Sequence, residues 1–272
     1  MWATRFIATF IFALYPGIIS AQTIDFAGGA RSMGMGGASV SISDAWAVFN
    51  NIGALAGTDE NAFGVSYLTL YGIEGFNAVS ACLNLPASDF NYGFGVHYFG
   101  DDLYNEGRLT AGASHKIKFV SLGVAASYLR YNVREFASHG SFIVEAGGKA
   151  ELFPGFHVAA CVFNVNKAKA PGERVAPVLM RAGVSFRPGE NLTINIDFEK
   201  HTATPAAVKP GIEYVPASWV SFRTGIATNP SRAHFGLGLQ SRFIGVDYGF
   251  SSHPSLGLSS QVSVNIKLRK KS

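Results

Sequence analysis

The sequence predicts an all-β protein, an antiparallel transmembrane β-barrel of about fourteen strands, and three observations support that fold class. Apolar and polar side chains alternate through most of the chain, as in residues 192–199. A strand directs successive side chains to opposite faces, so each such segment has one apolar and one polar face. An apolar leader precedes these segments, and short and long connections alternate between them. In a soluble β-sandwich, short and long connections are not expected to alternate in this way.

Composition agrees with a membrane barrel. The chain has 272 residues, of which 48% are hydrophobic and 15% charged, against roughly 25% charged in soluble domains. The net charge of +4 is scattered, apart from a basic tail at 269–272 that we expect to be solvated. Nucleic acid is therefore not an expected partner. Two cysteines, Cys82 and Cys161, are too few for a disulfide framework, and we expect both to be free.

Residues 1–21 form the expected signal peptide. Arg5 precedes an apolar run from Phe6 to Ile19, and Ser20-Ala21 stand before Gln22. The run is short for a spanning helix, and this arrangement is typical of a cleaved secretory leader. Export combined with a barrel predicts the outer membrane of a Gram-negative bacterium, with its lipid as the surroundings.

The barrel is expected over residues 61–268. Strand lengths near ten residues suit tilted strands that cross a bilayer. The expected strands span residues 62–71, 75–85, 90–99, 107–117, 121–132, 141–152, 156–166, 175–187, 191–200, 206–215, 218–227, 232–241, 243–251 and 256–268. The joints after every even-numbered strand are short, whereas those after odd-numbered strands are longer on average. Outer-membrane barrels have short periplasmic turns and longer outer loops, so both chain ends are expected in the periplasm.

Alternation also assigns the two faces of the wall. A charged side chain at the lipid-facing midplane costs roughly 2–4 kcal/mol, so the charges are expected to point inward. The outward set includes Phe90, Tyr92, Phe94, Val96, Tyr98, Leu122, Val124, Ala126, Tyr128, Val220, Phe222, Ile226, Ile244, Val246, Tyr248, Phe250, Val262, Val264, Ile266 and Leu268. The lumenal charges of most interest are Arg108, Glu145, Arg181, Asp197, Glu199, Arg223 and Asp247. Mutual neutralisation of these charges is favoured over a path for substrate. His115 and Pro210 break the pattern on their strands.

Residues 22–60 lack the alternation and are expected to be a plug. Fourteen strands fall between the eight that side chains can fill and the sixteen that leave a channel. The glycines of residues 28–37 permit close backbone approach inside a confined lumen. Ser43 or Asp44 is expected to cap a short helix that runs to about Asn50.

The stretch Gly29-Ala30-Arg31-Ser32-Met33-Gly34-Met35-Gly36-Gly37-Ala38, followed by 44–56, resembles the N-terminal signature of the FadL-like outer-membrane proteins, with the PorV/PorQ group of Bacteroidetes-type bacteria closest. Ile52 replaces the usual proline, and the chain does not end on an aromatic residue. The resemblance implies a fourteen-stranded barrel with an N-terminal hatch. The candidate hatch residues are Arg31, Met33, Gly34, Gly36, Gly37, Asp44, Trp46, Phe49 and Asn50.

This resemblance implies two different functions. FadL-like proteins carry hydrophobic molecules across the outer membrane. PorV and PorQ serve type IX secretion and bind exported proteins or the translocon, a role in which residues 100–106, 134–140 and 166–174 would bind protein. For Trp46, Phe49 and Met33, packing against the wall is favoured over a ligand pocket.

Other chemistry is not indicated. The glycine-rich stretch lacks the preceding strand and the Gly-Lys-Ser/Thr ending of a phosphate loop. The histidines are not at metal-ligand spacing, so no metal or cofactor is predicted. No nucleophile motif is present, and a scattered set such as Ser114, His234 and Asp247 is weaker evidence than a motif. We therefore expect a protein that is not an enzyme.

Overall fold

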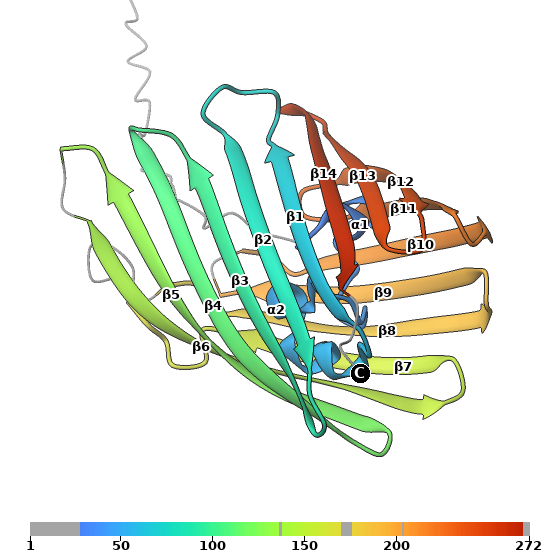
Figure 1. Ribbon diagram of the computed structural model, residues 1–272. Coiled ribbons are helices and arrows are strands. Elements are labelled where there is room, and N and C mark those ends of the chain that lie inside the picture. The colour runs from blue at the N-terminus through green and yellow to red at the C-terminus, as the bar shows by residue number, and fades with distance from the viewer. Residues whose placement is uncertain (1–27, 136–137, 170–175, 203, 269–272) are drawn as a thin grey trace, which may run out of the picture.

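The computed structural model describes residues 28–135, 138–169, 176–202 and 204–268, so the expected signal peptide and basic tail lie outside the described residues. The described chain forms a closed antiparallel barrel of fourteen strands, which confirms the predicted fold class (Figure 1). The strands are β1 (Asn61–Thr69), β2 (Asn77–Pro86), β3 (Phe90–Gly100), β4 (Tyr104–Ile117), β5 (Val120–Val133), β6 (His139–Phe153), β7 (Phe156–Phe163), β8 (Leu179–Gly189), β9 (Leu192–His201), β10 (Ala207–Ala217), β11 (Val220–Ala227), β12 (Arg232–Gln240), β13 (Ile244–His253) and β14 (Gly257–Leu268).

The wall closes where β1 pairs with β14, from Asn61 opposite Leu268 to Thr69 opposite Ser260. Closure leaves no sheet edge, and a lipid-facing edge would expose unpaired backbone groups to hydrocarbon. Burial alternates as the sequence predicts. On the outward face Val124 is 63% exposed, whereas the inward Asp197 is 1% exposed. The period of two has therefore separated an apolar outer band from a polar lumen.

The two ends of the barrel differ, as the turn lengths predict. At the short-turn end, two or three residues join each pair of strands: 87–89, 118–119, 154–155, 190–191, 218–219 and 241–243. At the long-loop end the connections reach from 164 to 178 between β7 and β8. Because β14 ends at Leu268 on the short-turn end, where β1 begins at Asn61, the direction of each strand follows from its number.

The two pattern-breaking residues have local explanations. His115 lies near the short-turn end, where its ring packs 4.9 Å from that of Phe90 and its Nδ1 contacts the Asp89 carbonyl. Pro210 remains inside β10 and faces Ile196 of β9. Proline has no N–H to donate to a neighbouring strand, so it weakens the pairing of β10 with β11. The β10–β11 ladder is limited to residues 211–214 and Ala217 of β10.

The N-terminal segment, residues 28–60, lies inside the barrel (Figure 1). It contains α1 (Ala30–Gly34), α2 (Ala47–Asn50) and the 3₁₀ turn η1 (Ile52–Gly57). Asp44 accepts a 3.0 Å hydrogen bond from the Trp46 N–H and so caps the turn that leads into α2. In the described residues no helix is long and apolar enough to cross a membrane.

Glycines of the wall make room for this segment. At each of them an added Cβ would lie under 3.0 Å from an atom of the segment, which real Cβ atoms essentially never do. We call this set the glycine belt: Gly64, Gly93, Gly95, Gly112, Gly123, Gly147, Gly183, Gly211, Gly225, Gly236 and Gly249. The segment therefore fits the wall at the distance of backbone contact, and its shape is complementary to the lumen.

Candidate functional site: the lumen and its N-terminal segment

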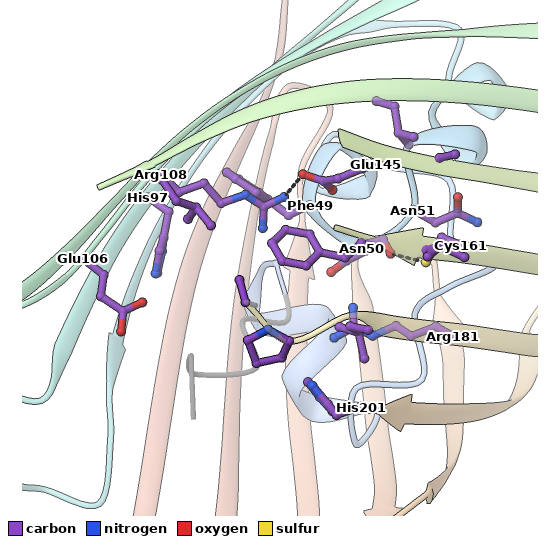
Figure 2. Close-up of a pocket in the computed structure, with 18 of the residues that line it drawn as sticks. Phe49, Asn50, Asn51, His97, Glu106, Arg108, Glu145, Cys161, Arg181 and His201 are labelled. Carbon is purple, nitrogen blue, oxygen red and sulfur yellow. Dashed lines mark hydrogen bonds and ion pairs between the residues drawn. The ribbon is translucent and has the colours of Figure 1, made fainter. Parts of the chain in front are cut away.

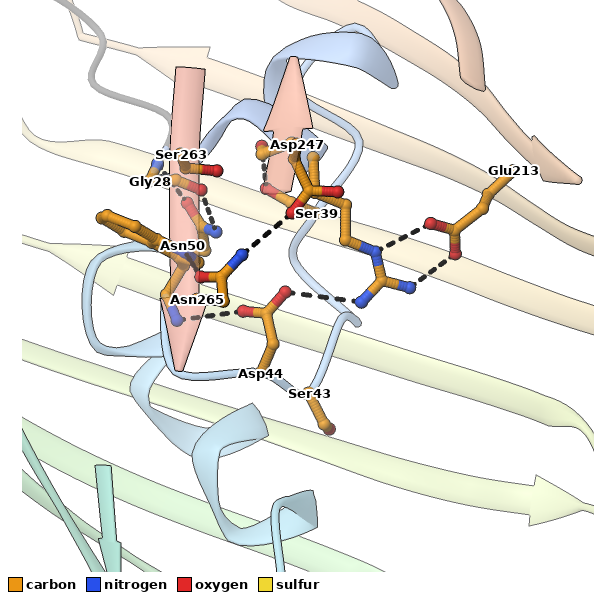
Figure 3. A network of polar contacts seen from close by, with 12 residues as sticks. Gly28, Ser39, Ser43, Asp44, Asn50, Glu213, Asp247, Ser263 and Asn265 are labelled. Atoms are coloured by element: carbon orange, nitrogen blue, oxygen red, sulfur yellow. Dashed lines mark hydrogen bonds and ion pairs between the residues drawn. The ribbon is translucent and has the colours of Figure 1, made fainter. Parts of the chain in front are cut away.

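Arg31 joins the segment to the wall. Its guanidinium donates to Glu213 on β10 through Nε at 2.9 Å and Nη2 at 2.5 Å, and Nη1 lies 3.4 Å from Asp44 (Figure 3). The fork of an arginine suits a bidentate contact with a carboxylate. Asp44 and Glu213 thus lie on opposite sides of one cation, which holds α1 against β10.

The network continues along the wall. Arg223 on β11 bonds to Glu213 and to Asp247 on β13, both at 2.7 Å. Asn265 on β14 donates to Asp247 at 2.9 Å and accepts from the Trp46 indole N–H at 2.6 Å (Figure 3). A buried charge needs a partner, and in this network each cation lies between two carboxylates.

The pKa of Asp44 is raised above its usual value. Burial is the largest cause, and the charge of Asp247 adds to it, whereas the positive charge of Arg31 opposes the shift. The carboxylate therefore gains less from its pair than it loses through desolvation.

Backbone groups of the segment also bond to the wall. Asp197 on β9 accepts from the Val40 N–H at 2.8 Å, and the Asn195 side chain donates to the Ala38 carbonyl at 2.9 Å. The Asn51 side-chain amide donates to the carbonyls of Val40 and Gly148. These bonds satisfy irregular backbone that neither a helix nor a strand could pair.

The rest of the segment packs through apolar contacts. Trp46 and Phe49 stack with their ring centroids 6.4 Å apart, inside a buried cluster that includes Cys82 of β2 and Ala125 of β5. Both cysteines are free. Met33 does not join this cluster; it packs with Leu68, Ala78 and Phe99 in another.

An apolar cavity borders Phe49, and its lining reaches Phe99, Glu106 and Tyr131 towards the long-loop ends of β3 to β5. Figure 2 shows Phe49 among the side chains that line it. Its volume is about 80 Å³. The apolar part of its lining comes from the segment, from β3 to β8 and from the loop before β8, and includes Phe49, Ile52, Phe99, Leu129, Tyr131, Val162, Phe163, Pro177 and Leu179.

Both arginines that line the apolar cavity are paired with carboxylates, whereas Glu106, which also lines it, accepts a hydrogen bond from the Tyr104 hydroxyl. Arg108 on β4 bonds to Glu145 on β6 at 2.5 Å, and Arg181 on β8 bonds to Glu199 on β9 at 2.7 Å. The Arg108 guanidinium also lies over two aromatic rings, 5.4 Å from the centre of Phe49 and 4.9 Å from that of Phe163. Such cation–π contacts hold the cation against the rings. The two arginines therefore offer no unpaired positive charge to a ligand.

Two further cavities flank the segment. The short-turn cavity has a volume of about 540 Å³ and is lined by the Arg31 network together with Asp59, Glu60 and Lys267. The basic cavity has a volume of about 370 Å³, lies in the long-loop half beside α1, and is lined by Lys209, Arg232, His234 and His253 among others. Among the described residues, no group of three His, Cys, Asp or Glu could hold a metal ion.

No protein-family model matches this chain, and no curated protein matches it. Several solved structures are similar to it. The Pseudomonas putida toluene transporter TodX gives a TM-score of 0.67 at 12% identity, covering 90% of this chain and 98% of that one. The Ralstonia pickettii toluene transporter TbuX gives 0.65 at 11% identity, covering 90% and 100%. A Pseudomonas aeruginosa FadL homologue gives 0.66 at 12% identity, covering 89% and 98%. The chain has the FadL-type barrel fold. At these identities the likeness concerns the fold, and the ligand must be inferred from this chain's own residues.

The predicted site residues occupy distinct places in this FadL-type barrel. Arg31, Asp44 and Trp46 belong to the short-turn network, whereas Phe49 and Asn50 line the apolar cavity. Gly34 lies against Gly236, and Gly36 against the backbone of Ile226. Six of the seven lumenal charges have a carboxylate or a cation as partner: Arg108, Glu145, Arg181, Glu199, Arg223 and Asp247. The seventh, Asp197, accepts from the backbone of the segment.

Several contributors were not among the predicted site residues. Glu213 anchors Arg31, Asn265 anchors Trp46, and the glycine belt receives the segment. The belt has a signal in the sequence, since glycine recurs at inward positions of most strands. The partners of the two anchors have no such signal, because Arg31 and Glu213 are 182 residues apart.

Proposed function

We propose that the protein is an outer-membrane channel that passes a small, uncharged hydrophobic molecule, with the N-terminal segment as its plug. One observation carries the proposal: the apolar cavity adjoins the buried segment at Phe49, most of its lining is carbon, and both of its arginines are paired with carboxylates. An apolar ligand gains from leaving water, whereas it would lose by separating unpaired charges from their hydration.

The likeness of the fold supports this proposal. TodX and TbuX are described as toluene transporters, and a molecule of that size suits a narrow cavity. An aromatic ligand would meet Phe49 and Phe163, which can stack on it at little cost. The ligand would then reach the segment, whose displacement or rearrangement controls further passage.

Filling the cavity tests the route. Leu129→Trp adds bulk to the lining from β5, where Leu129 is 4% exposed. We expect the initial rate of toluene uptake by cells that express the variant to fall several-fold. The matched control is Leu122→Trp on the lipid face of the same strand, where the side chain is 58% exposed. Equal uptake by the wild type and Leu129→Trp would contradict the route.

Deleting residues 23–58 tests the plug. The segment fills the lumen between the apolar and short-turn cavities, so its loss should join them into one continuous passage. We expect single-channel conductance in planar bilayers to rise strongly. Unchanged conductance in a barrel that still shows heat-modifiable mobility on gels would exclude a plugging role.

The PorV/PorQ role in type IX secretion is the alternative. It would place protein binding on the long-loop end, for example on residues 101–103 and 134–135. This role does not depend on the cavities or contacts inside the lumen. Purification of the tagged protein with a large secretion translocon, together with unchanged uptake in Leu129→Trp, would favour this alternative over transport.

A further inference from the structure

Glu106 differs from the other charged residues that line the apolar cavity. Arg108 and Glu145 are paired with each other, and Arg181 is paired with a carboxylate of β9. Among the described residues no cation forms an ion pair with Glu106, whose partner is the Tyr104 hydroxyl. Figure 2 shows Glu106 apart from the Arg108–Glu145 pair and from Arg181. The protein thus neutralises the arginines of this cavity but not the carboxylate of Glu106.

The wall around Glu106 is aromatic and closely packed. On β4, Glu106 lies opposite Phe99 of β3 and opposite Tyr131 of β5. All three side chains line the cavity, and their exposed fractions are 8% for Glu106 and 5% for each of the two rings. Burial of a polar group is costly unless hydrogen bonds replace its hydration. The number of hydrogen bonds that Glu106 accepts therefore decides how well it is stabilised.

One oxygen of Glu106 remains available to a ligand. The Tyr104 hydroxyl donates to Oε1, whereas Oε2 accepts from none of the described residues. Oε2 is not fully buried either, and because Glu106 lines the cavity, this oxygen reaches its interior. A carboxylate can accept about four hydrogen bonds. A molecule in the cavity that carries a hydrogen-bond donor would therefore find an acceptor there.

The remaining charges and the apolar lining limit what else such a molecule can carry. An anion would be repelled by Glu106, and a cation would have to lie in the same cavity as Arg108 and Arg181. A strongly polar molecule would lose its hydration against Leu129 and Leu179. A pure hydrocarbon would cover these side chains but would leave Oε2 without a hydrogen bond. A neutral molecule with one donor and a compact apolar body satisfies both parts of the lining.

We infer that the apolar cavity selects a small uncharged alcohol, whose hydroxyl donates to Oε2 of Glu106 while Phe99 and Leu129 contact its apolar body. The inference rests on the proposed function, since it specifies which neutral molecules the same cavity admits. Glu106 is then a specificity-determining residue. A site that hydrogen-bonds a hydroxyl discriminates against an analogue without that donor, because its own polar group would be left unpaired.

Calorimetric titration of the purified full-length barrel in detergent measures this selectivity, with injections into protein-free micelles subtracted. Benzyl alcohol carries the donor, whereas benzyl methyl ether has the same ring and oxygen without it. We expect the wild type to bind benzyl alcohol about ten-fold more tightly than the ether, which corresponds to about 1.4 kcal/mol. Equal affinities would overturn the inference, and this comparison requires no variant to fold.

Variants of Glu106 assign the preference to its carboxylate. Glu106→Leu removes the acceptor and should bring the two affinities to about the same value, whereas Glu106→Gln keeps a carbonyl oxygen and should restore most of the preference for the alcohol. Glu190→Leu is the matched control, because Glu190 is exposed and lines none of the three cavities. If Glu106→Leu weakened both ligands equally, Glu106 would have only a structural role and the inference would be wrong.

Uptake by cells distinguishes a failure of this inference from a failure of the proposed function. Leu129→Trp should slow the uptake of benzyl alcohol and of benzyl methyl ether alike. Wild-type uptake by Leu129→Trp would contradict the passage, and a ten-fold preference in the titration would still support the site. Slowed uptake by Leu129→Trp combined with equal affinities in the titration would support the passage and contradict the role of Glu106.

Discussion

The two halves of the N-terminal segment are held in the lumen by different forces. Residues 45–55 pack by shape, in an apolar cluster pressed against glycines of β1 and β3 to β6. Residues 30–44 also lie against belt glycines, those of β8 and β10 to β13, but they are held in addition by charge and hydrogen bonds, through Arg31, Asp44 and the backbone of Val40. The first half depends on volume, which one methyl group can upset. The second depends on pairs that one substitution leaves incomplete.

This difference predicts how each half can be broken. A change of volume should disturb the apolar half most strongly, because neither glycine backbone nor the barrel wall can move aside. A change of charge should disturb the polar half less, because Glu213 keeps a second cation in Arg223.

The largest effect is expected from Gly53→Ala in η1. The added Cβ would lie against the backbone of Gly147 and Gly148 on β6, which cannot yield without breaking the wall. We expect a loss of about 2–3 kcal/mol in the free energy of unfolding by urea and a rise in conductance. Gly189→Ala is the control, because nothing lies within 4 Å of its added Cβ. Equal stability of the two variants would show that η1 is not tightly packed against β6.

Arg31→Met should come next. The substitution keeps an unbranched, largely aliphatic side chain and removes the cation between Asp44 and Glu213, with an expected loss of about 2 kcal/mol. Urea unfolding measures it. Lys267→Met, which removes the exposed pair with Glu60, serves as the comparison and should cost less than about 1 kcal/mol. A larger loss for Lys267→Met would contradict the anchoring role of Arg31.

Trp46→Phe tests the junction of the two halves. The variant keeps most of the packing on Phe49 but loses the indole N–H that donates to Asn265 at 2.6 Å. A loss of about 1 kcal/mol is expected in the same measurement. Trp219→Phe, where the side chain is 61% exposed, should be near neutral. If the two tryptophan variants behave alike, the bond to Asn265 does not stabilise the segment.

The smallest effect concerns pH. Because the folded-state pKa of Asp44 is raised, its favourable contribution is complete below the unfolded value of about 4 and is lost as pH rises through the folded value. Relative to Asp44→Asn, the wild type should therefore lose stability from about pH 4 upward. Urea unfolding of both proteins at several pH values checks this. If the stability of the wild type relative to Asp44→Asn instead increased as pH rises, the attraction of Arg31 for the Asp44 carboxylate would exceed the cost of burying that carboxylate.

Local patterns were enough to predict the wall. Alternation identified all fourteen strands to within a few residues, and turn parity identified the short-turn end. Both signals are local, because a strand's face repeats every second residue and a turn lies between neighbours in sequence. Even the outward-facing residues could be assigned, since apolar and charged side chains fall on opposite faces of each strand. Trp46, Phe49 and Met33 were less predictable, because nothing local shows that Met33 packs with a different cluster.

The side-chain contacts inside the lumen depend on closure of the barrel. The sequence alone specified which side chains point inward, since that depends on a period of two. It could not specify that Arg31 meets Glu213 or that Trp46 meets Asn265, 219 residues away. Nor could it show that Arg108 pairs with Glu145 and Arg181 with Glu199 while Glu106 bonds to the Tyr104 hydroxyl. Those contacts depend on which strands face each other across the lumen, and only the closed tertiary structure sets that arrangement.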